Sequence, residues 1–404
     1  MVSDWSWDVS LTYSTSTYER RRPDVSRSAF QQALVTGAFN PFASALTANP
    51  GDEAFNAPEV FDLFSVDATL RAKQQIYVAD AVVSRELFST DAGPVELALG
   101  GQYRRETLDQ DVDPFTEAGD LLAVGQDNDS FVARNTAAVF AEASVPITEA
   151  INMQLALRYE RFSGGTDTLN PKVALTWAPN DAILLRATYG TSFRSPELVE
   201  FGATTSSSAR VDDPLTPAAD PVTFSTQIVG SPDLQPESSE NYQVGFVLTP
   251  ADGLSLSVDY FSFEFTDKIE RERAQEILEA NPNDPRVLRS AITGAITGFA
   301  PLSFINVGSE IFRGIDAELK WDIDLGDMGA LTLNGAVQYV TEFEERDKDG
   351  TVLSTALGYP ETSAILGATW SYGSGSLTVT GRHFGGYDET ESLSFGSHSG
   401  PVTV

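Results

Sequence analysis

Apolar and polar residues alternate with a period of two along most of this chain. Between residues 151 and 160 every odd position is apolar, from Ile151 to Tyr159, and most even positions are polar or charged. The same alternation recurs from Trp5 to Val379. Successive side chains of a β-strand point to opposite faces, so this pattern predicts strands with one apolar face each. The predicted fold class is all-β.

Thirteen strands are predicted from the limits of these segments. They cover 5–13, one strand within 61–88, 95–106, 131–146, 151–162, 169–178, 182–193, 238–249, 254–266, 303–322, 331–342, 361–370 and 376–384. The 61–88 segment is ambiguous, because Asp80 interrupts its alternation. An odd number of strands cannot close with every neighbour antiparallel, and open edges in a bilayer leave backbone groups unpaired. We therefore expect about 13 strands of a larger antiparallel transmembrane β-barrel.

Alternation alone leaves open whether the apolar faces meet lipid or a second sheet, as in a soluble β-sandwich. Two features of the strands favour lipid. The apolar rows often end in Tyr or Trp, for example at Tyr159 and Trp321, as in the aromatic belts of membrane barrels. The polar rows carry the charges, which a hydrated lumen would accommodate. Two stacked sheets that bury Leu155, Leu256 and Leu333 would contradict this interpretation.

The lengths of the connections also favour a membrane barrel. Short connections fall near 89–94, 147–150, 179–182, 250–253, 323–330 and 371–376. Long connections fall near 14–60, 107–130, 194–237, 267–302 and 343–360, and 163–168 is the small member of that set. Every second connection of an up-and-down barrel lies at the same end. Strict alternation therefore predicts one rim of tight turns and one rim of large loops.

Composition excludes several functional classes. The 404 residues include 26 Lys and Arg against 58 Asp and Glu, a formal net charge of −32 that would be repelled by nucleic-acid phosphates. The chain has no Cys and only two His, His383 and His398, so disulfides, thiolate zinc sites and a histidine-based hydrolytic triad are not expected. No pair of acids stands out as a glycosidase pair. We expect neither enzymatic activity nor a cofactor.

Two further absences bear on targeting. The chain contains no run of about 18 apolar residues, so no transmembrane helix is predicted. The first residues, Met1 to Trp5, lack the basic and apolar regions of a signal peptide. For an exported protein, we would expect the natural beginning to be missing from this sequence.

Five segments in order resemble TonB-dependent outer-membrane receptors. Their barrels carry an Asn-Pro-Lys strand start, found here within 169–177, and an "FRxPxL" motif, found within 185–198. Segment 234–245 is similar to their "L-x-PE-x-S-x-x-Y-E-x-G" strand start, and 306–318 to their "N-x-G … x-GxE" strand. Segment 100–106 matches their "GxEYRxE" motif. The similarity extends more weakly along the whole chain.

The resemblance implies a barrel of about 22 strands in the bacterial outer membrane, closed by an N-terminal plug domain. Such receptors bind a scarce nutrient at their loops and import it when TonB pulls on the plug. This sequence shows no plug or TonB box before Trp5 and no closing strands after Val404. We therefore expect residues 1–404 to form one partial barrel domain without the plug. The implied partners are outer-membrane lipid, a small-molecule or oligosaccharide ligand, and the TonB complex through the missing plug.

Several residues are weak candidates for binding sites. Asp109, Asp111 and Asp113 have a spacing that could gather oxygen ligands for calcium, but the segment lacks the Gly and distal Glu of an EF-hand, and a solvated acidic loop is the simpler interpretation. The acidic segment 342–350 is interpreted in the same way. Segment 268–280 predicts a short surface helix that ends at Asn281-Pro282, and a packing lid within a loop is favoured over a partner-binding helix.

Three arginines are candidates for ligand or plug contact. Arg194 leads into the large 194–237 loop and could contact an anionic ligand, although pairing across strands is the simpler role. Arg158 and Arg186 lie on the polar face and could contact a plug or simply line water. The sequence does not rank these two roles.

Three functions therefore stay open from the sequence. The first is a TonB-dependent transporter of an iron chelate, a cobalamin-like corrinoid or an oligosaccharide. The second is a non-gated porin or adhesin barrel, and the third a secreted soluble β-sandwich that binds carbohydrate.

Overall fold

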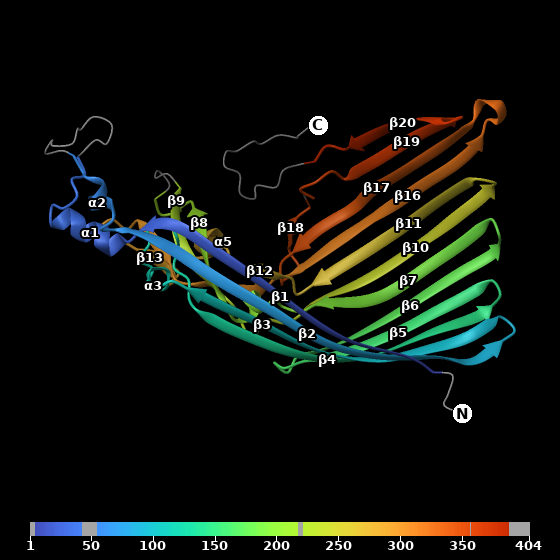
Figure 1. Ribbon diagram of the computed structural model, residues 1–404, viewed down its shortest axis with the longest axis horizontal. Helices are drawn as coiled ribbons and strands as arrows, with labels where there is room; N and C mark the ends of the chain where they lie inside the picture. Colours follow the sequence, from blue (N-terminus) through green and yellow to red (C-terminus); the bar gives the residue numbers. More distant parts are fainter. Residues whose placement is uncertain (1–4, 43–54, 217–220, 356, 388–404) are drawn as a thin grey trace.

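The main element of the protein is one large antiparallel sheet (Figure 1). The computed structural model describes residues 5–42, 55–216, 221–355 and 357–387. Thirteen strands are neighbours in a single path: β1 (Ser6–Val25), β2 (Ser65–Thr90), β3 (Gly93–Val112), β4 (Ser130–Thr148), β5 (Ile151–Phe162), β6 (Asp167–Asn180), β7 (Ile183–Arg194), β10 (Glu237–Ala251), β11 (Leu254–Thr266), β16 (Ser309–Asp324), β17 (Ala330–Arg346), β19 (Thr362–Tyr372) and β20 (Gly375–Phe384). A fourteenth strand, β18 (Val352–Ser354), pairs with β17. The all-β fold is confirmed.

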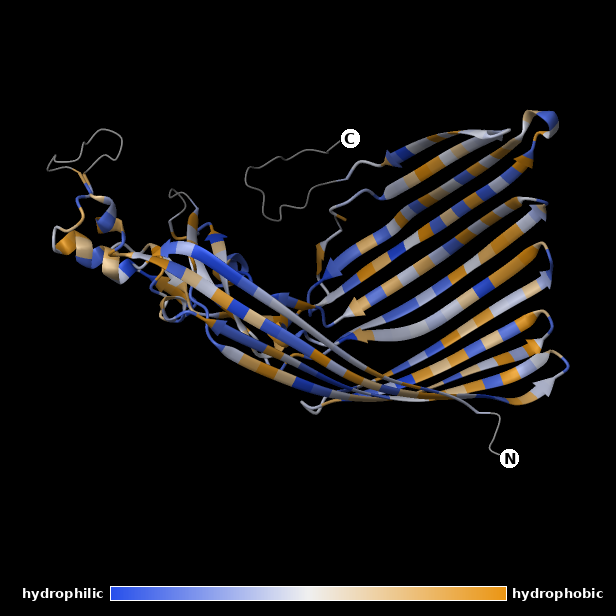
Figure 2. Cartoon of the chain, viewed as in Figure 1, coloured by the Kyte–Doolittle hydropathy of each residue, from blue (hydrophilic) through white to orange (hydrophobic). Residues whose placement is uncertain are grey.

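The strand register joins the apolar rows into one continuous outer face. Leu254 on β11 lies opposite Trp321, which lies opposite Leu333, which in turn lies opposite Ala368. Figure 2 shows the alternation of polar and apolar residues along the strands. We call the face that carries these apolar rows the outer face and the opposite face the inner face.

No second sheet covers the outer face within the described residues. Leu155 is 38% exposed, and Leu256 and Leu333 are half-buried. These three side chains are therefore not packed between two stacked layers. The soluble β-sandwich considered from the sequence is wrong.

The aromatic residues of the outer face divide by type between the two ends of the strands. All five tryptophans lie near one end, at Trp5, Trp7, Trp177, Trp321 and Trp370. Tyrosines prevail toward the other end, where Tyr189 lies opposite Tyr242. Amphipathic rings at two levels are typical of the two interfaces of a membrane. The predicted aromatic belts are present.

The connections alternate in length as predicted. At the tryptophan end, the turn end, five of six turns have two residues, and the sixth contains a 3-10 helix, η1 (Gly326–Met328). At the opposite end, the loop end, the connections contain α1 (Arg27–Val35), α2 (Pro58–Phe61), α3 (Pro114–Glu117), α4 (Leu198–Gly202), β8 (Thr204–Val211), β9 (Val222–Val229), β12 (Ile269–Arg271), α5 (Ala274–Ala280), β13 (Val287–Arg289), β14 (Ile296–Phe299) and β15 (Leu302–Asn306).

Several predicted boundaries are wrong. β1 continues to Val25, far into the predicted 14–60 loop, whereas β2 begins at Ser65, within the predicted 61–88 segment. Here β2 carries its apolar residues on the inner face, where Val66 and Ala68 pack against Leu121 and Val124 of a connection. The predicted 303–322 strand is two strands, β15 and β16. The chain turns between them at Gly308, where a β-carbon would lie 1.6 Å from the carbonyl oxygen of Arg346.

The helix predicted over 268–280 is shorter than expected. Its C-terminus is correct, since Asn281 is the C-cap, but residues 269–271 form β12 and the helix begins at Ala274. Ala274 and Leu278 are buried. The helix therefore packs within the loop layer, in agreement with the packing role favoured from the sequence.

The largest hydrophobic core lies in the connections rather than against the sheet. Its buried residues come from the connections at 195–236 and 267–308: Val211, Ile228, Leu234, Ile269, Ala274, Leu278, Val287, Ile296, Phe299, Leu302 and Phe304. In the part of the chain that the structure describes, no helix combines the length and apolarity needed to cross a membrane.

The two faces predict opposite tolerance to charge at adjacent positions of β17. Val337 is on the outer face and Gln338 on the inner face, and both are exposed. We expect Val337→Arg to destabilise the protein in lipid vesicles, lowering its free energy of unfolding by about 2 to 4 kcal/mol, because the guanidinium would enter hydrocarbon. Gln338→Arg, the matched control, should change it little. Urea titration of tryptophan fluorescence measures both, and equal losses would contradict the assignment of the faces.

Candidate functional site

A polar network crosses the inner face of the first strands. Gln102 donates through Nε2 to Asp80 Oδ1 at 2.6 Å and accepts from Arg158 Nη2 at 3.0 Å. Arg158 also pairs with the buried Glu160, and its guanidinium lies 5.5 Å from the centre of the Phe140 ring. Asp80 thus belongs to the inner face, which resolves the ambiguity that it caused in the sequence.

Arg186 forms a second inner-face pair, which spans two strand spacings. Its Nε donates to Asp259 Oδ1 at 2.7 Å, and its Nη2 donates to Oδ2. Gly245 on β10 lies between them, opposite both residues in the register. A β-carbon at Gly245 would lie 2.0 Å from Asp259 Oδ1, so the bridge requires glycine at this position.

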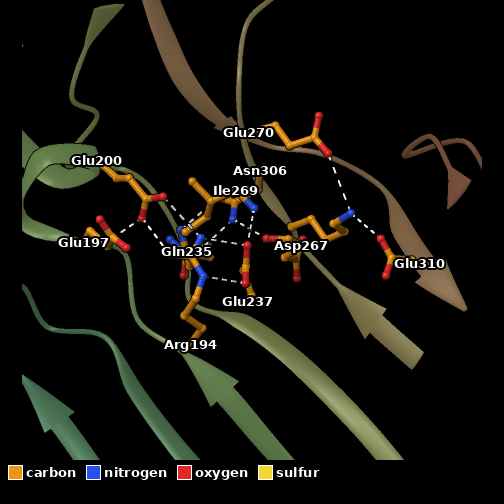
Figure 3. A network of polar contacts seen from close by, with 11 residues as sticks. Arg194, Glu197, Glu200, Gln235, Glu237, Asp267, Ile269, Glu270, Asn306 and Glu310 are labelled. Atoms are coloured by element: carbon orange, nitrogen blue, oxygen red, sulfur yellow. Dashed lines mark hydrogen bonds and ion pairs between the residues drawn. The ribbon is translucent and has the colours of Figure 1, made fainter. Parts of the chain in front are cut away.

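Arg194 joins four elements at the loop end (Figure 3). Its Nε and Nη2 donate to Glu237 at 2.7 and 2.8 Å, and its Nη1 donates to Glu200 Oε2 at 2.9 Å. Glu237 also accepts the backbone N–H of Ile269 on β12 at 2.7 Å, and Glu200 accepts that of Glu197 at the start of α4. The simpler expectation for Arg194, pairing across strands, describes this geometry.

Asn306 ties the two large connections together beside Arg194. Its side chain accepts the N–H of Gln235 at 2.9 Å and donates to the carbonyl oxygens of Gln235 and Asp267 at 2.9 and 2.7 Å. Asp267 has a φ of 55°, which is unusual for a residue other than glycine. The motif residues Arg194, Glu237 and Asn306, far apart in the sequence, thus lie in one region.

Lys268 lies in a cluster of carboxylates at the same end. It pairs with Glu310, and its Nζ lies 3.5 Å from Glu345 and 3.8 Å from Glu270. Burial disfavours the charge, but the three carboxylates outweigh it and raise the pKa of Lys268 above its usual value. The ammonium therefore stays charged and holds β12 against β16 and β17.

The long connections fold onto the inner face of β3 and β4. Leu198 and Ala203, at either end of α4, pack against Leu108 and Val132. Arg134 on β4 pairs with Glu106 at 2.9 Å and donates to the carbonyl oxygen of Pro196. These contacts place the 195–236 connection over the inner side of the wall.

Gln110 anchors a further connection from β3. Its Nε2 lies 3.1 Å from Asp127 Oδ1 and from the carbonyl oxygens of Asn128 and Thr204. Asp127 is buried, and burial raises its pKa above the usual value. Nothing in the local sequence marks Arg134, Gln110 or Asp127, because their partners come from distant connections.

The three aspartates considered as calcium ligands have different roles in the structure. Asp109 and Asp111 are on β3, opposite Lys73 and Arg71 of β2. Asp113 caps α3 and accepts N–H groups of Phe115, Thr116 and Thr69 at 2.7 to 3.0 Å. Burial opposes ionisation of Asp113, but these donors and the Thr116 hydroxyl lower its pKa. Among the described residues, no three His, Asp or Glu side chains are placed to hold a metal ion, so the geometry does not support this hypothesis.

The acids at 342–350 are more than a solvated loop. Glu342 pairs with Arg313 at 2.7 Å, and Glu344 pairs with Arg346 at 2.8 Å. β17 continues to Arg346, so Glu342 and Glu344 belong to a strand of the large sheet rather than to a loop. Their role is at least partly structural.

Comparisons with known proteins agree with this architecture. The model of the family described as "TonB dependent receptor-like, beta-barrel" matches residues 2–402. The chain belongs to this family. TonB-dependent receptors are outer-membrane proteins, so the apolar outer face lies in the outer membrane.

Two curated relatives are iron-regulated outer membrane virulence proteins from two Vibrio cholerae strains. One is 27% identical over 145 residues, which are 36% of this chain and 20% of the relative. The other is 25% identical over 185 residues, 46% of this chain and 24% of the relative. The matches therefore cover at most a quarter of each relative's length.

Similar solved structures are siderophore receptors. A ferric enterobactin receptor (PfeA) mutant from Pseudomonas aeruginosa is 18% identical with a TM-score of 0.63, and the match covers 98% of this chain and 50% of that one. The siderophore receptor PirA from Acinetobacter baumannii is also 18% identical, with a TM-score of 0.57 and coverages of 95% and 48%. The chain spans about half the length of these receptors, and identities this low support the fold alone.

The Arg186 bridge predicts sensitivity at Gly245. We expect Gly245→Ala to destabilise the barrel by about 1 to 3 kcal/mol, because the added methyl group displaces Asp259 from Arg186. Gly381→Ala on β20 is the matched control, since a β-carbon there would meet nothing within 4 Å. Thermal unfolding measures both, and an unchanged melting temperature for Gly245→Ala would contradict the bridge.

An ion pair between Asp213 and Arg289 joins two of the long connections, and we expect it to be sensitive to acid. Arg289 donates to both oxygens of Asp213 at 2.6 and 2.9 Å, which lowers the pKa of that carboxyl. We expect Asp213→Asn to destabilise the loop core by about 3 kcal/mol at neutral pH, because it leaves Arg289 without its counter-charge. The ion pair contributes its full stabilisation above the usual carboxyl pKa of about 3.9. This stabilisation is lost as the pH falls through the lowered pKa of Asp213.

Limited proteolysis of the 267–308 connection measures this effect at neutral pH. Glu276→Gln is the control, since Glu276 pairs with Arg273 on the exposed surface and should contribute little. Equal protease resistance of Asp213→Asn and the native protein would contradict the prediction.

Proposed function

We propose that this chain forms the wall and outer loops of a receptor that imports a ferric chelate across the outer membrane with energy from TonB. The observation that carries the proposal is the folding of the 195–236 connection onto the inner face, through Arg134, Leu198 and Ala203. A loop layer that narrows the lumen suits a receptor that captures its ligand before transport. A non-gated porin would instead need an open path.

The kind of ligand is inferred from the names of similar proteins. The relatives are iron-regulated outer membrane proteins, and the similar structures are receptors of ferric enterobactin and other siderophores. They favour an iron chelate over the corrinoid or the oligosaccharide that the sequence also left open. Arg194 is engaged by two carboxylates, so we assign it to positioning the loops rather than to binding the chelate.

We further propose that a plug domain contacts the inner face, which would couple the receptor to TonB. Arg158 and Arg186 are candidates for this contact, since their side chains remain 33% and 42% exposed although each is paired. A hollow of about 500 Å³ near the turn end is lined by charged residues that include Glu96, Glu142 and Lys172. These groups offer partners of both signs to a plug surface.

Uptake of radioactive iron tests the proposed function. Bacteria that lack the gene for this receptor should no longer accumulate ⁵⁵Fe supplied as a ferric siderophore. Ferric enterobactin is the first probe in a panel of siderophores. Deletion of tonB should cause the same loss, because the transport step needs TonB energy. Uptake that survives loss of TonB would favour a passive pore, and a deletion that leaves uptake of every chelate in the panel intact would contradict an iron receptor.

A further inference from the structure

Four phenylalanines form a row of rings on the inner face of the sheet, where the neighbouring side chains are mostly polar. Phe261, Phe263 and Phe265 alternate along β11 on the face that does not carry Tyr260, and Phe312 of β16 lies opposite Phe263. The ring centres of adjacent members are 5.5 to 6.3 Å apart. We call these four residues the phenylalanine ladder.

Small and polar residues on the adjacent strands leave room for the ladder. On β10, Asn241 lies opposite Phe263. On β16, Gly314 lies opposite Phe261, and a β-carbon at Gly314 would lie 2.5 Å from the Phe261 ring. The ring of Phe261 therefore lies over the glycine of the next strand, and the ladder forms a continuous apolar surface across β11 and β16.

The ladder lies at the loop end of the wall and is partly open to the lumen. Phe261 is buried, but the other three rings are only half-buried, and none of the four belongs to the three buried apolar clusters of the described residues. Tyr260, which packs against Tyr242 of the tyrosine belt, directly precedes Phe261. The ladder therefore runs from the level of this belt toward the loops. A ligand that arrives from the loop side reaches this level first.

An apolar surface of this kind is typical of a binding site, and the charges around it indicate what it binds. Carboxylates border the ladder on the inner face, at Asp259 and Asp316 toward the turn end and at Glu310 and Glu345 toward the loop end. Two cations lie among them, Arg186 and Lys268, and each is held in an ion pair. Because carboxylates outnumber cations, this part of the lumen repels anions, whereas the faces of aromatic rings attract cations and apolar groups.

Ferric chelates differ in net charge according to the groups that hold the iron. Each catecholate brings two negative charges and each hydroxamate brings one. Three catecholates around Fe³⁺ therefore leave a negatively charged complex, and three hydroxamates leave a neutral one with a largely aliphatic exterior. We propose that the phenylalanine ladder contacts a ferric trihydroxamate chelate. This inference rests on the proposed import of a ferric chelate and adds the chemical class of that chelate.

Equilibrium binding of ⁵⁵Fe-labelled chelates to the purified receptor tests this inference without transport. Ferrichrome supplies a neutral trihydroxamate and ferrioxamine B a trihydroxamate with a positive charge. Ferric enterobactin, the first probe of the uptake panel, supplies a negatively charged tricatecholate. We expect both trihydroxamates to bind about tenfold more tightly than ferric enterobactin, because like charges repel. Added salt should narrow this difference, since it screens the repulsion.

The contribution of the rings is tested with the double variant Phe263→Ala/Phe312→Ala. It should weaken binding of ferrichrome about tenfold, because two rings at the centre of the apolar surface are lost. Phe131→Ala is the matched control, since Phe131 lies on the outer face of β4 and is 68% exposed. This control should bind ferrichrome normally. Heat-dependent mobility on gels checks the folding of each variant.

The contribution of the charges is tested with Glu345→Gln, which also covers the case in which the double variant fails to fold. Glu345 is partly exposed, and Lys268 keeps its closer partner Glu310 in this variant. The loss of one carboxylate should strengthen binding of ferric enterobactin several-fold and leave binding of the neutral ferrichrome unchanged.

Three results would overturn the inference. The first is binding of ferric enterobactin at least as tight as that of the two trihydroxamates. The second is unchanged affinity for ferrichrome in a folded double variant, which would indicate that a plug rather than the ligand covers the ladder. The third is no binding of either trihydroxamate. The proposed function would survive each of these results if uptake of ⁵⁵Fe from another chelate still required the receptor and TonB.

Discussion

Pairing of backbone groups is the constraint on which this structure depends. Hydrocarbon offers no partner to an N–H or a C=O, so each strand in the membrane must form its hydrogen bonds with neighbouring strands. Between β1 and β20 the sheet meets this requirement with antiparallel neighbours and short turns at one end, while β1 and β20 themselves each have one neighbour among the described residues. Pairing of β6 with β7 ends at Lys172 and Gly190, next to Tyr189 of the tyrosine belt, where water can satisfy the backbone groups.

Lipid takes the place of a core for the sheet, and this frees the connections to build their own. The loop layer contains the largest group of buried apolar residues, including Leu278 and Leu302. Arginines then join the parts: Arg134 holds the 195–236 connection to the wall, and Arg194 joins β7, α4, β10 and β12. A planar guanidinium can serve two carboxylates at once, so these bridges fix positions more than they add stability.

The strands were predictable because the alternation of apolar and polar residues is a local signal, which lipid imposes on every strand that crosses the membrane. The outward-facing apolar row ends where the lipid ends, which explains why β1 was predicted too short. It also fails in the connections, where β12 was predicted as part of a helix and β15 as part of β16. There the pairing partners are distant, as when β9 pairs with β15. The polar role of Asp80 became clear only through Gln102 on the next strand.

The sequence by itself determined the class of fold, the order of the strands along the main path of the large sheet, and which end carries the large loops, because each of these follows from periodicity and spacing along the chain. It also contained the motifs of the family. Only the tertiary structure decided that Arg194, Glu237 and Asn306 lie together, that Gly245 lets Arg186 reach Asp259, and that Phe312 joins the row of rings on β11. These features arise from contacts between strands and loops far apart in sequence, and no local pattern encodes such distances.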